Sequence, residues 1–268
     1  MSGRSMRKVA GLCLAAAFVL PLSSVSASAV DWTLTLGVEG RVMPSYKGSD
    51  RYVLRPIPLF DIRRAGTPER FQAPRDGASI GLLEYGRFRA GPTFKIVTPR
   101  DDGDDVDLTG LGDVDWTLEA GLFAEYWFTD WLRARAEVRK GFGGHHGIVG
   151  DLTADVVVPV TPKLTFSAGP RMTVVSNSAN QPYFSIDPTQ SAASGLPVYD
   201  AGGGIQSYGL GAQARYKFTQ QFAGHVFVEY ERLADDVASS PLVQQRGTAN
   251  QIQVGIGATY AFDIPGLW

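Results

Sequence analysis

The strictest constraint on this chain is a two-residue alternation between apolar and polar side chains, repeated over segments of about ten residues. In the segment 114–128 every even-numbered side chain is aliphatic or aromatic, whereas the odd-numbered ones include Asp115, Glu119 and Glu125. Successive side chains of a β-strand point to opposite faces, so each segment has one charge-free face and one polar face. The alternation predicts an all-β fold of long amphipathic strands.

The same pattern recurs at 32–42, 132–139 and 251–262. A soluble β-sandwich also alternates, but two features favour a membrane barrel: the apolar faces carry no charge, and aromatic residues gather near strand ends. These aromatic residues are Trp32, Trp116, Tyr126, Phe128, Trp131, Tyr216, Phe218, Tyr260 and Phe262. Because lipid cannot hydrogen-bond to backbone groups, the strands have to pair all the way round. We therefore predict a closed antiparallel transmembrane β-barrel.

The strand count follows from the connections, because barrels of this kind have short turns at one rim and long loops at the other. Short turns are predicted at 85–86, 129–130, 161–162 and 219–221, and long loops at 99–113, 143–147, 177–203 and 234–250. An even count requires the stretch 69–84 to supply two strands, separated by a turn at Pro74-Arg75-Asp76-Gly77. This predicts twelve strands, or ten if the second pair is irregular.

Charged side chains on the polar faces are expected to meet inside the barrel. The polar faces of the two strands that flank the turn at 129–131 align if the numbers of each pair of opposite residues sum to 260. This register places Glu125 opposite Arg135. The predicted charge ladder in the lumen comprises Glu119, Glu125, Arg133, Arg135, Glu137 and Arg139. In so narrow a lumen these groups either set the selectivity of a small pore or neutralise each other inside a plugged barrel.

The N-terminus has the composition of a secretory signal peptide. Three basic residues among the first eight precede an apolar run, and Ala27 and Ala29 form a small-residue cleavage site. We expect residues 1–29 to be removed and 30–268 to form the barrel domain. A lipoprotein signal at Cys13 is the disfavoured alternative, because the bulky Leu12 precedes it. The mature chain then has no cysteine, and its stability cannot rest on disulfides.

The overall charge and hydropathy argue against two further classes of protein, nucleic-acid-binding proteins and helical membrane proteins. The formal net charge is −2, with no basic surplus that would indicate a nucleic-acid partner. Beyond the N-terminal segment there is no run of about 18 apolar residues, the minimum for a transmembrane helix.

Several motifs in the predicted loops resemble a known family. The most specific block contains Tyr183, Phe184, Ser191, Ser194, Gly195, Pro197 and Tyr199. It is flanked by 44–50, 110–113, 201–204 and 239–243 in matching order. Together these segments closely resemble the MipA/OmpV family, named for an MltA-interacting protein. The tail 263–268 departs from the family pattern, in which the chain usually ends at an aromatic residue corresponding to Phe262.

The resemblance implies an outer-membrane protein without enzymatic activity. The founding member of the family is described as a scaffold that joins a murein-degrading transglycosylase to a murein-synthesising penicillin-binding protein. Other relatives are described as porin-like. We therefore expect an outer-membrane scaffold with both termini in the periplasm, in contact with outer-membrane lipid and lipopolysaccharide, with a narrow channel for small solutes as the alternative.

Catalytic and metal sites are not expected. Ser191 and Ser194 lack the Gly-x-Ser-x-Gly elbow of a serine hydrolase, and His225 is a single histidine on a lumenal face that also carries carboxylates. His145 and His146 are adjacent, so they point in opposite directions on a strand and make a poor chelating pair. No cofactor is predicted.

A cluster of five aspartates lies in one predicted loop, at Asp101, Asp102, Asp104, Asp105 and Asp107. Its spacing is not that of an EF-hand, which requires a glutamate at the twelfth position. We expect a solvated acidic loop, with a cation-bridged contact to lipopolysaccharide as the alternative.

Overall fold

The computed structural model describes residues 30–67 and 69–265. The predicted signal peptide 1–29, with Ala27 and Ala29, lies outside the described residues. Ten long strands form the body of the molecule: β1 (Val30–Pro44), β2 (Tyr52–Arg64), β5 (Phe88–Val97), β6 (Thr117–Trp127), β7 (Leu132–Gly143), β8 (Ile148–Pro159), β9 (Leu164–Val175), β10 (Gly204–Lys217), β11 (Phe222–Leu233) and β12 (Asn250–Pro265). Two short strands, β3 (Ala78–Ser79) and β4 (Leu83–Tyr85), complete the sheet.

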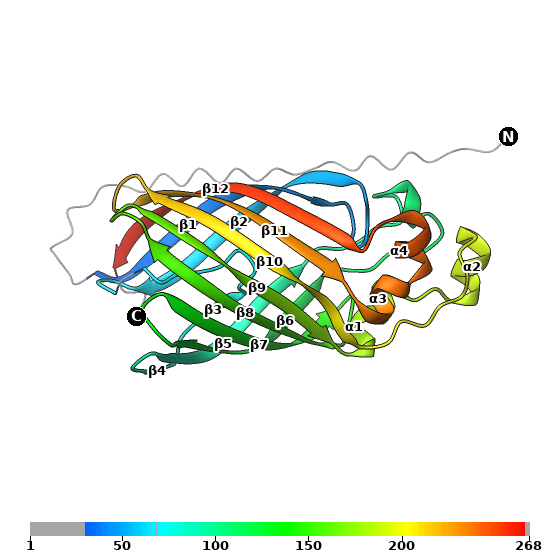
Figure 1. Cartoon of the computed structure of the whole chain (residues 1–268), viewed down its shortest axis with the longest axis horizontal. Coiled ribbons are helices and arrows are strands. Elements are labelled where there is room, and N and C mark those ends of the chain that lie inside the picture. Colours follow the sequence, from blue (N-terminus) through cyan, green and yellow to red (C-terminus); the bar gives the residue numbers. More distant parts are fainter. Residues whose placement is uncertain (1–29, 68, 266–268) are drawn as a thin grey trace.

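The strands form one antiparallel sheet that curls into a barrel (Figure 1). Its order is β2-β1-β12-β11-β10-β9-β8-β7-β6-β5-β3, so the first and last long strands pair with each other. The predicted all-β barrel is confirmed. The predicted register is also confirmed, because Glu125 lies opposite Arg135.

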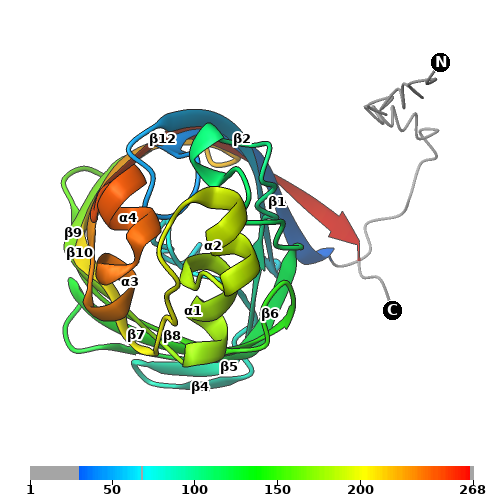
Figure 2. The ribbon, with the colours of Figure 1, turned by 90° about the vertical axis from the view of Figure 1, so that its right-hand side faces the viewer.

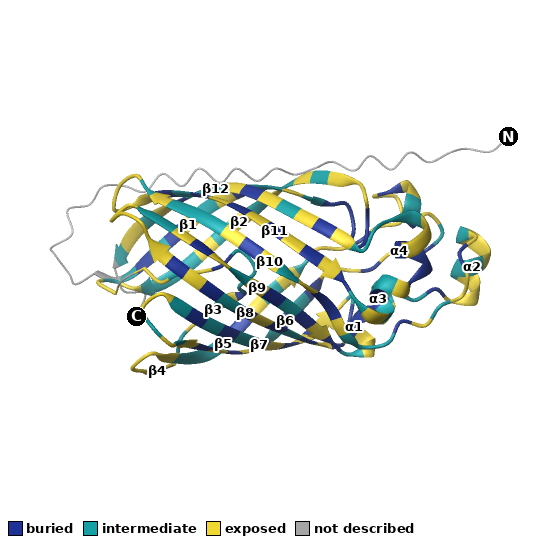
Figure 3. Ribbon diagram, viewed as in Figure 1, coloured by how far each residue is buried: buried dark blue, intermediate teal, exposed yellow. Residues whose placement is uncertain are grey.

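Burial along each strand alternates in the sense expected of a membrane barrel (Figure 3). Outward side chains such as Leu54, Ile96 and Leu122 are 71%, 71% and 67% exposed, whereas the inward Arg133 is 0% exposed. A soluble protein places these residue types the other way round. The molecule is therefore a membrane-spanning barrel with an apolar exterior and a polar interior.

The two rims of the barrel differ as predicted. The turn rim consists of 65–67, 69–70, 86–87, 128–131, 160–163 and 218–221. The loop rim consists of 45–51, 98–116, 144–147, 176–203 and 234–249, and it carries all the helices. These helices are η1 (Val106–Leu108), α1 (Asn177–Phe184), α2 (Pro188–Ser194), α3 (Asp235–Ser239) and α4 (Pro241–Arg246). No helix within the described residues has the length and apolar character needed to cross a membrane.

The stretch 69–84 does not form the predicted pair of strands. A turn forms at 73–76, where Asp76 N donates to Ala73 O at 3.0 Å, but 69–77 forms no strand. Both β3 and β4 pair with β5, so these two fragments occupy a single position in the sheet. The sheet has twelve strands within the described residues, but β3 and β4 are pieces of one irregular strand, and the second strand predicted for 69–84 is absent.

The sheet ends at β2, and two prolines give the reason. Ser45 N donates to Arg51 O at 2.9 Å, and the register continues without a shift along β2. Odd-numbered residues of β2 therefore hydrogen-bond to β1, and the even-numbered Pro56 and Pro58 face the free edge. Proline has no N–H to donate, so it belongs on an edge strand. Within the described residues no backbone pairing joins β2 to β3 or β4.

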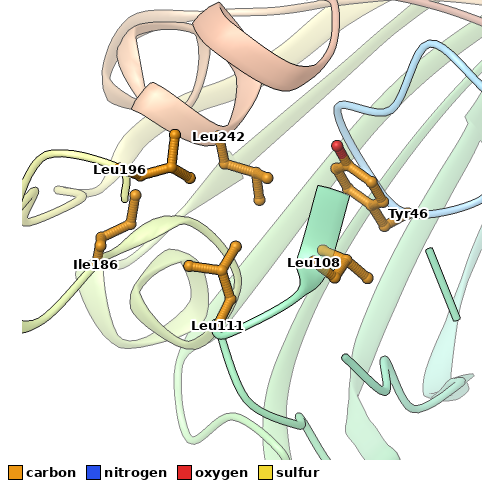
Figure 4. Packing of buried hydrophobic residues seen from close by; sticks show 6 residues of the cluster. All are labelled: Tyr46, Leu108, Leu111, Ile186, Leu196 and Leu242. Atoms are coloured by element: carbon orange, nitrogen blue, oxygen red, sulfur yellow. The ribbon is translucent and has the colours of Figure 1, made fainter. Parts of the chain in front are cut away.

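The loop rim is covered by a folded cap, in which α1 to α4 lie across the end of the barrel (Figure 2). Six buried side chains from four loops form its core (Figure 4): Tyr46, Leu108, Leu111, Ile186, Leu196 and Leu242. A second apolar cluster joins it to the top of β11: Phe184, Ala201, Leu233, Val237 and Val243. Loops that pack on one another in this way form a structured cover.

Candidate functional site

The lumen is the candidate site, and near the turn rim it is built around Arg133. This side chain is 0% exposed and is held by three carboxylates. Its guanidinium lies 2.7 Å from Glu125, 2.6 Å from Asp76 and 3.1 Å from Asp155. Because an unpaired charge is very costly in such a place, the three partners are what allow the arginine to remain buried and ionised.

A second centre lies further along β7 at Arg139. Its Nε donates to Glu119 at 2.8 Å, and its two terminal nitrogens contact Glu137 and Asp151. Arg135 connects the two centres, since it lies 2.7 Å from Glu137 and 3.4 Å from Glu125. All six residues named from the sequence thus meet in one connected network.

The network also includes residues that the sequence reasoning did not single out. Asp151 and Asp155 lie on β8, and Arg171 on β9 contacts Asp155 at 2.5 Å. Like the lumenal residues of β7, these three residues have odd numbers and lie on the polar face of their strands. The alternation rule extended to 148–175 would therefore have found them. Asp76 is different, because it comes from a segment that forms no strand.

The segment 69–77 enters the lumen and links opposite walls; we call it the inner segment. Arg75 contacts Glu229, Glu231 at 2.9 Å and Thr173 at 2.9 Å. On the other wall, Gly77 N donates to Glu137 at 3.1 Å. A Cβ on Gly77 would lie 2.5 Å from Thr93 Oγ1, so the close approach requires glycine. The inner segment is therefore anchored on both sides of the barrel.

The three histidines take separate positions. His225 Nε2 lies 2.6 Å from Glu39, and both side chains are buried. His145 Nε2 lies 3.1 Å from Glu119, and its Nδ1 accepts from Gly147 N, whereas His146 is exposed. The two adjacent imidazoles do not share a ligand position. Within the described residues no group of three His, Cys, Asp or Glu side chains is arranged to hold a metal.

The serines of the motif block stabilise their own loop. Ser191 Oγ donates to Leu196 O at 2.7 Å, and Ser194 Oγ accepts from Leu196 N at 3.2 Å. Gly195, which follows Ser194 at the end of α2, has a φ of +78°, a left-handed conformation that favours glycine. These contacts give the two hydroxyls a structural role in ending α2.

The remaining motif residues hold the cap together. Phe184 is 1% exposed in the second cap cluster, and Tyr199 Oη donates to Asp236 O at 2.8 Å. Tyr183 lies over the guanidinium of Arg100, and Pro197 follows the core residue Leu196. Burial, together with the charges of Asp236 and Asp200, raises the pKa of Tyr199. The motif thus encodes the packing of the cap.

The acidic loop is only partly solvated, which corrects the sequence expectation. Asp101, Asp102 and Asp104 are exposed, but Asp105 is 8% exposed. Asp105 accepts from Ser45 Oγ at 2.5 Å and from Arg51 at 2.6 Å. Asp105 therefore ties two loops of the cap together, and Asp107 adds to this contact at 3.3 Å from Arg51.

A cavity remains between the inner segment and the cap; we call it the chamber. It has a volume of about 340 Å³. Pro74 and Arg75 lie on the inner-segment side, and Tyr46, Tyr183 and Phe184 lie on the cap side. The lumen is thus divided into an ion-paired part near the turn rim and a small cavity below the cap.

Comparison with known proteins identifies the family. A family model described as MltA-interacting protein MipA matches residues 36–262. The chain belongs to this family. Two curated relatives, from Escherichia coli strain K12 and from Shigella flexneri, are each named MltA-interacting protein and are 28% identical to it over 162 residues. Each match covers 60% of this chain and 63% of the relative.

The solved structures that match this chain include outer-membrane barrels, and both their TM-scores and their sequence identities to it are low. The NanC porin has a TM-score of 0.42 and 11% identity, covering 84% of this chain and 98% of that one. The COG4313 outer membrane channel of Pseudomonas putida F1 has a TM-score of 0.37 and 12% identity, covering 91% of this chain and 100% of that one.

Proposed function

We propose that this barrel lies in the outer membrane of a Gram-negative bacterium and acts as a non-enzymatic scaffold for a murein transglycosylase of the MltA type. Membership of the MipA family and the names of the two curated relatives support this partner. In this proposal a cleaved signal peptide directs export. The turn rim and both termini face the periplasm, and the capped rim faces lipopolysaccharide.

The filled lumen is the observation that carries the proposal. Arg133 and Arg139 are 0% and 1% exposed, and both are surrounded by carboxylates. The inner segment crosses the lumen from one wall to the other, and the cap has a packed core. A passive channel requires a continuous water-filled path, whereas this interior favours a rigid and closed wall. Such a barrel is well suited to hold a partner at the membrane.

The turn rim is the surface at which we place the partner. It exposes Arg64, Arg70, Arg87 and Lys163, and the described ends of β1 and β12 lie at the same rim. Some of these charges are already paired, as Arg70 is with Glu84 at 2.6 Å. Lys163 forms no ion pair within the described residues, which makes it the best position for a probe.

Site-specific photo-crosslinking tests this placement in living cells. A photoreactive amino acid at position 163 is expected to capture a murein transglycosylase, and solubilised adducts are expected to retain a penicillin-binding protein. The matched control is Val198, which is 59% exposed in the cap on the opposite rim. Capture from position 198 alone, or no capture from positions 64, 70, 87 and 163, contradicts the proposal.

The chamber favours a second candidate, a narrow channel for small solutes. Single-channel recording in planar bilayers separates the two functions. Silence of the intact barrel is expected for a scaffold. Stepwise conductance whose ion preference changes on Arg135→Glu is expected for a channel, because this residue belongs to the lumenal network.

A further inference from the structure

The chamber below the cap is lined by more positive than negative charge. Its basic residues are Arg41, Lys47, Arg55, Arg75, Lys95, Arg100 and Arg139. Its acidic residues are Glu119, Asp151, Glu229 and Glu231. Seven basic residues thus face four acidic ones, and the surplus charge of the lining is positive.

Three of the seven cations are matched by close carboxylates. Arg41 lies 2.7 Å from Glu39, Arg75 binds the two glutamates of β11, and Arg139 binds Glu119 and Asp151. These pairs also account for all four acidic groups of the lining. The acidic residues are therefore occupied by arginines and have little attraction left for a cationic guest.

The other four cations, Lys47, Arg55, Lys95 and Arg100, form no hydrogen bond to a carboxylate of the described residues. Lys95 is 3.8 Å from Asp151, which already accepts from Arg139 and Thr173, and Arg55 is 3.9 Å from Asp104 in the acidic loop. Lys47 Nζ contacts only the neutral amide oxygen of Gln206, at 2.5 Å, among the described side chains.

Arg100 is the most deeply buried of the four, at 8% exposed. It donates to Tyr183 O at 2.7 Å, and its buried Nε has no hydrogen-bond partner within the described residues. A buried guanidinium N–H left unsatisfied in this way is costly.

The positive charges also act on one another. Burial lowers the pKa of Lys47, Glu231 opposes this shift, and the nearby Arg75 and Lys95 add to it. An anion placed among these groups would relieve the repulsion and supply the acceptors that they lack.

We propose that the chamber binds one small organic anion through a carboxylate or phosphate group held by Lys47, Lys95 and Arg100. The volume of about 340 Å³ is within the range of small-molecule pockets. Tyr46, Tyr183 and Phe227 supply aromatic surface for the body of the ligand. This site does not depend on the scaffold function, because it lies inside the barrel and away from the turn rim.

Equilibrium dialysis of the purified full-length protein in detergent tests the site. Radiolabelled citrate, benzoate and inorganic phosphate are the anionic probes, and glucose and putrescine are the neutral and cationic ones. Long equilibration makes the result independent of the rate of entry below the cap. We expect saturable binding of at least one anion at one site per chain, and no saturable binding of glucose or putrescine.

Two variants on different segments locate the site. Lys47→Gln and Lys95→Gln should each weaken anion binding roughly tenfold or more, the usual effect of losing a charge-assisted hydrogen bond. Lys163→Gln, an exposed lysine on the turn rim, should leave it unchanged. Circular dichroism identifies any variant that fails to fold, in which case the other carries the test. The proposal is overturned if no anion binds saturably, if putrescine binds more tightly, or if both folded lysine variants bind as the wild type does.

Discussion

The barrel interior and the cap have cores of opposite character. In the interior the largest fully buried side chains are Arg133 and Arg139, surrounded by carboxylates. In the cap, a short distance along the same axis, the buried side chains are leucine, isoleucine, valine and aromatic residues. One chain therefore uses ion pairs to fill one region and apolar contacts to fill the other.

The difference comes from what surrounds each region. Strands that face lipid must place their apolar side chains outward, which leaves the alternate positions to fill the lumen with polar groups. The cap lies beyond the strands, so its loops bury apolar side chains as an ordinary soluble domain does. The two cores should respond differently to mutation.

The largest effect is expected in the polar core. Arg133→Met leaves Asp76, Glu125 and Asp155 without their shared cation, and breaking a buried ion pair typically costs about 3–5 kcal/mol. Urea unfolding of protein refolded into lipid vesicles measures this loss in the free energy of unfolding. Arg133→Lys, which keeps the charge but not the guanidinium geometry, is the matched control and should cost less. A loss below about 1 kcal/mol for Arg133→Met would show that these ion pairs are not the core of the barrel.

A smaller and more local effect is expected in the cap. Leu242 is 1% exposed in the first cap cluster, and truncating a buried leucine to alanine costs about 2–5 kcal/mol. Because the barrel does not depend on this contact, Leu242→Ala should expose 176–203 and 234–249 to protease while leaving the strands folded. Val198→Ala, at an exposed cap position, serves as control. Simultaneous loss of strand structure would mean that the two cores unfold as one unit.

The capping box of α2 tests the cap at its outer surface. Asp187 accepts from Gln190 N at 2.8 Å, and the Gln190 side chain bonds back to Asp187 N. Asp187→Ala should weaken α2 by about 1 kcal/mol, the usual value of an N-cap. Hydrogen exchange of the amides in 188–194 measures the change, and Asp187→Asn should largely retain protection. Equal exchange rates in Asp187→Ala and wild type would remove any role for this cap.

The smallest effect is expected for an ion pair on the turn rim. Arg87 lies 2.7 Å from Asp130, whose side chain is 93% exposed. Water screens such a pair, so Arg87→Ala should change the free energy of unfolding by no more than about 0.5 kcal/mol. The same urea titration applies. An effect comparable to that of Arg133→Met would contradict the distinction between buried and exposed ion pairs in this barrel.

Local pattern alone was enough to predict much of the architecture. The alternation assigned a lipid face and a lumen face to the strands at 32–42, 114–128, 132–139 and 251–262, and the connection lengths separated the two rims. The pairing of Glu125 with Arg135 followed from parity, because a slip of one residue would turn a charged face toward lipid. The six-residue charge ladder could be named in advance for the same reason.

Other features were decided only when distant segments came together. Nothing local distinguishes a strand at 69–77 from a segment that enters the lumen, since its contacts with Glu229, Glu137 and Arg133 come from residues 57 or more positions away. Proline fits an edge strand, but only the register of β2 on β1 places Pro56 and Pro58 on the free edge of the sheet. The cap core likewise joins four loops. Alternation is a property of neighbouring residues, so it can be recognised in the sequence. The inner segment, the free edge at β2 and the cap depend on contacts between distant surfaces, and only the tertiary structure determines which surfaces meet.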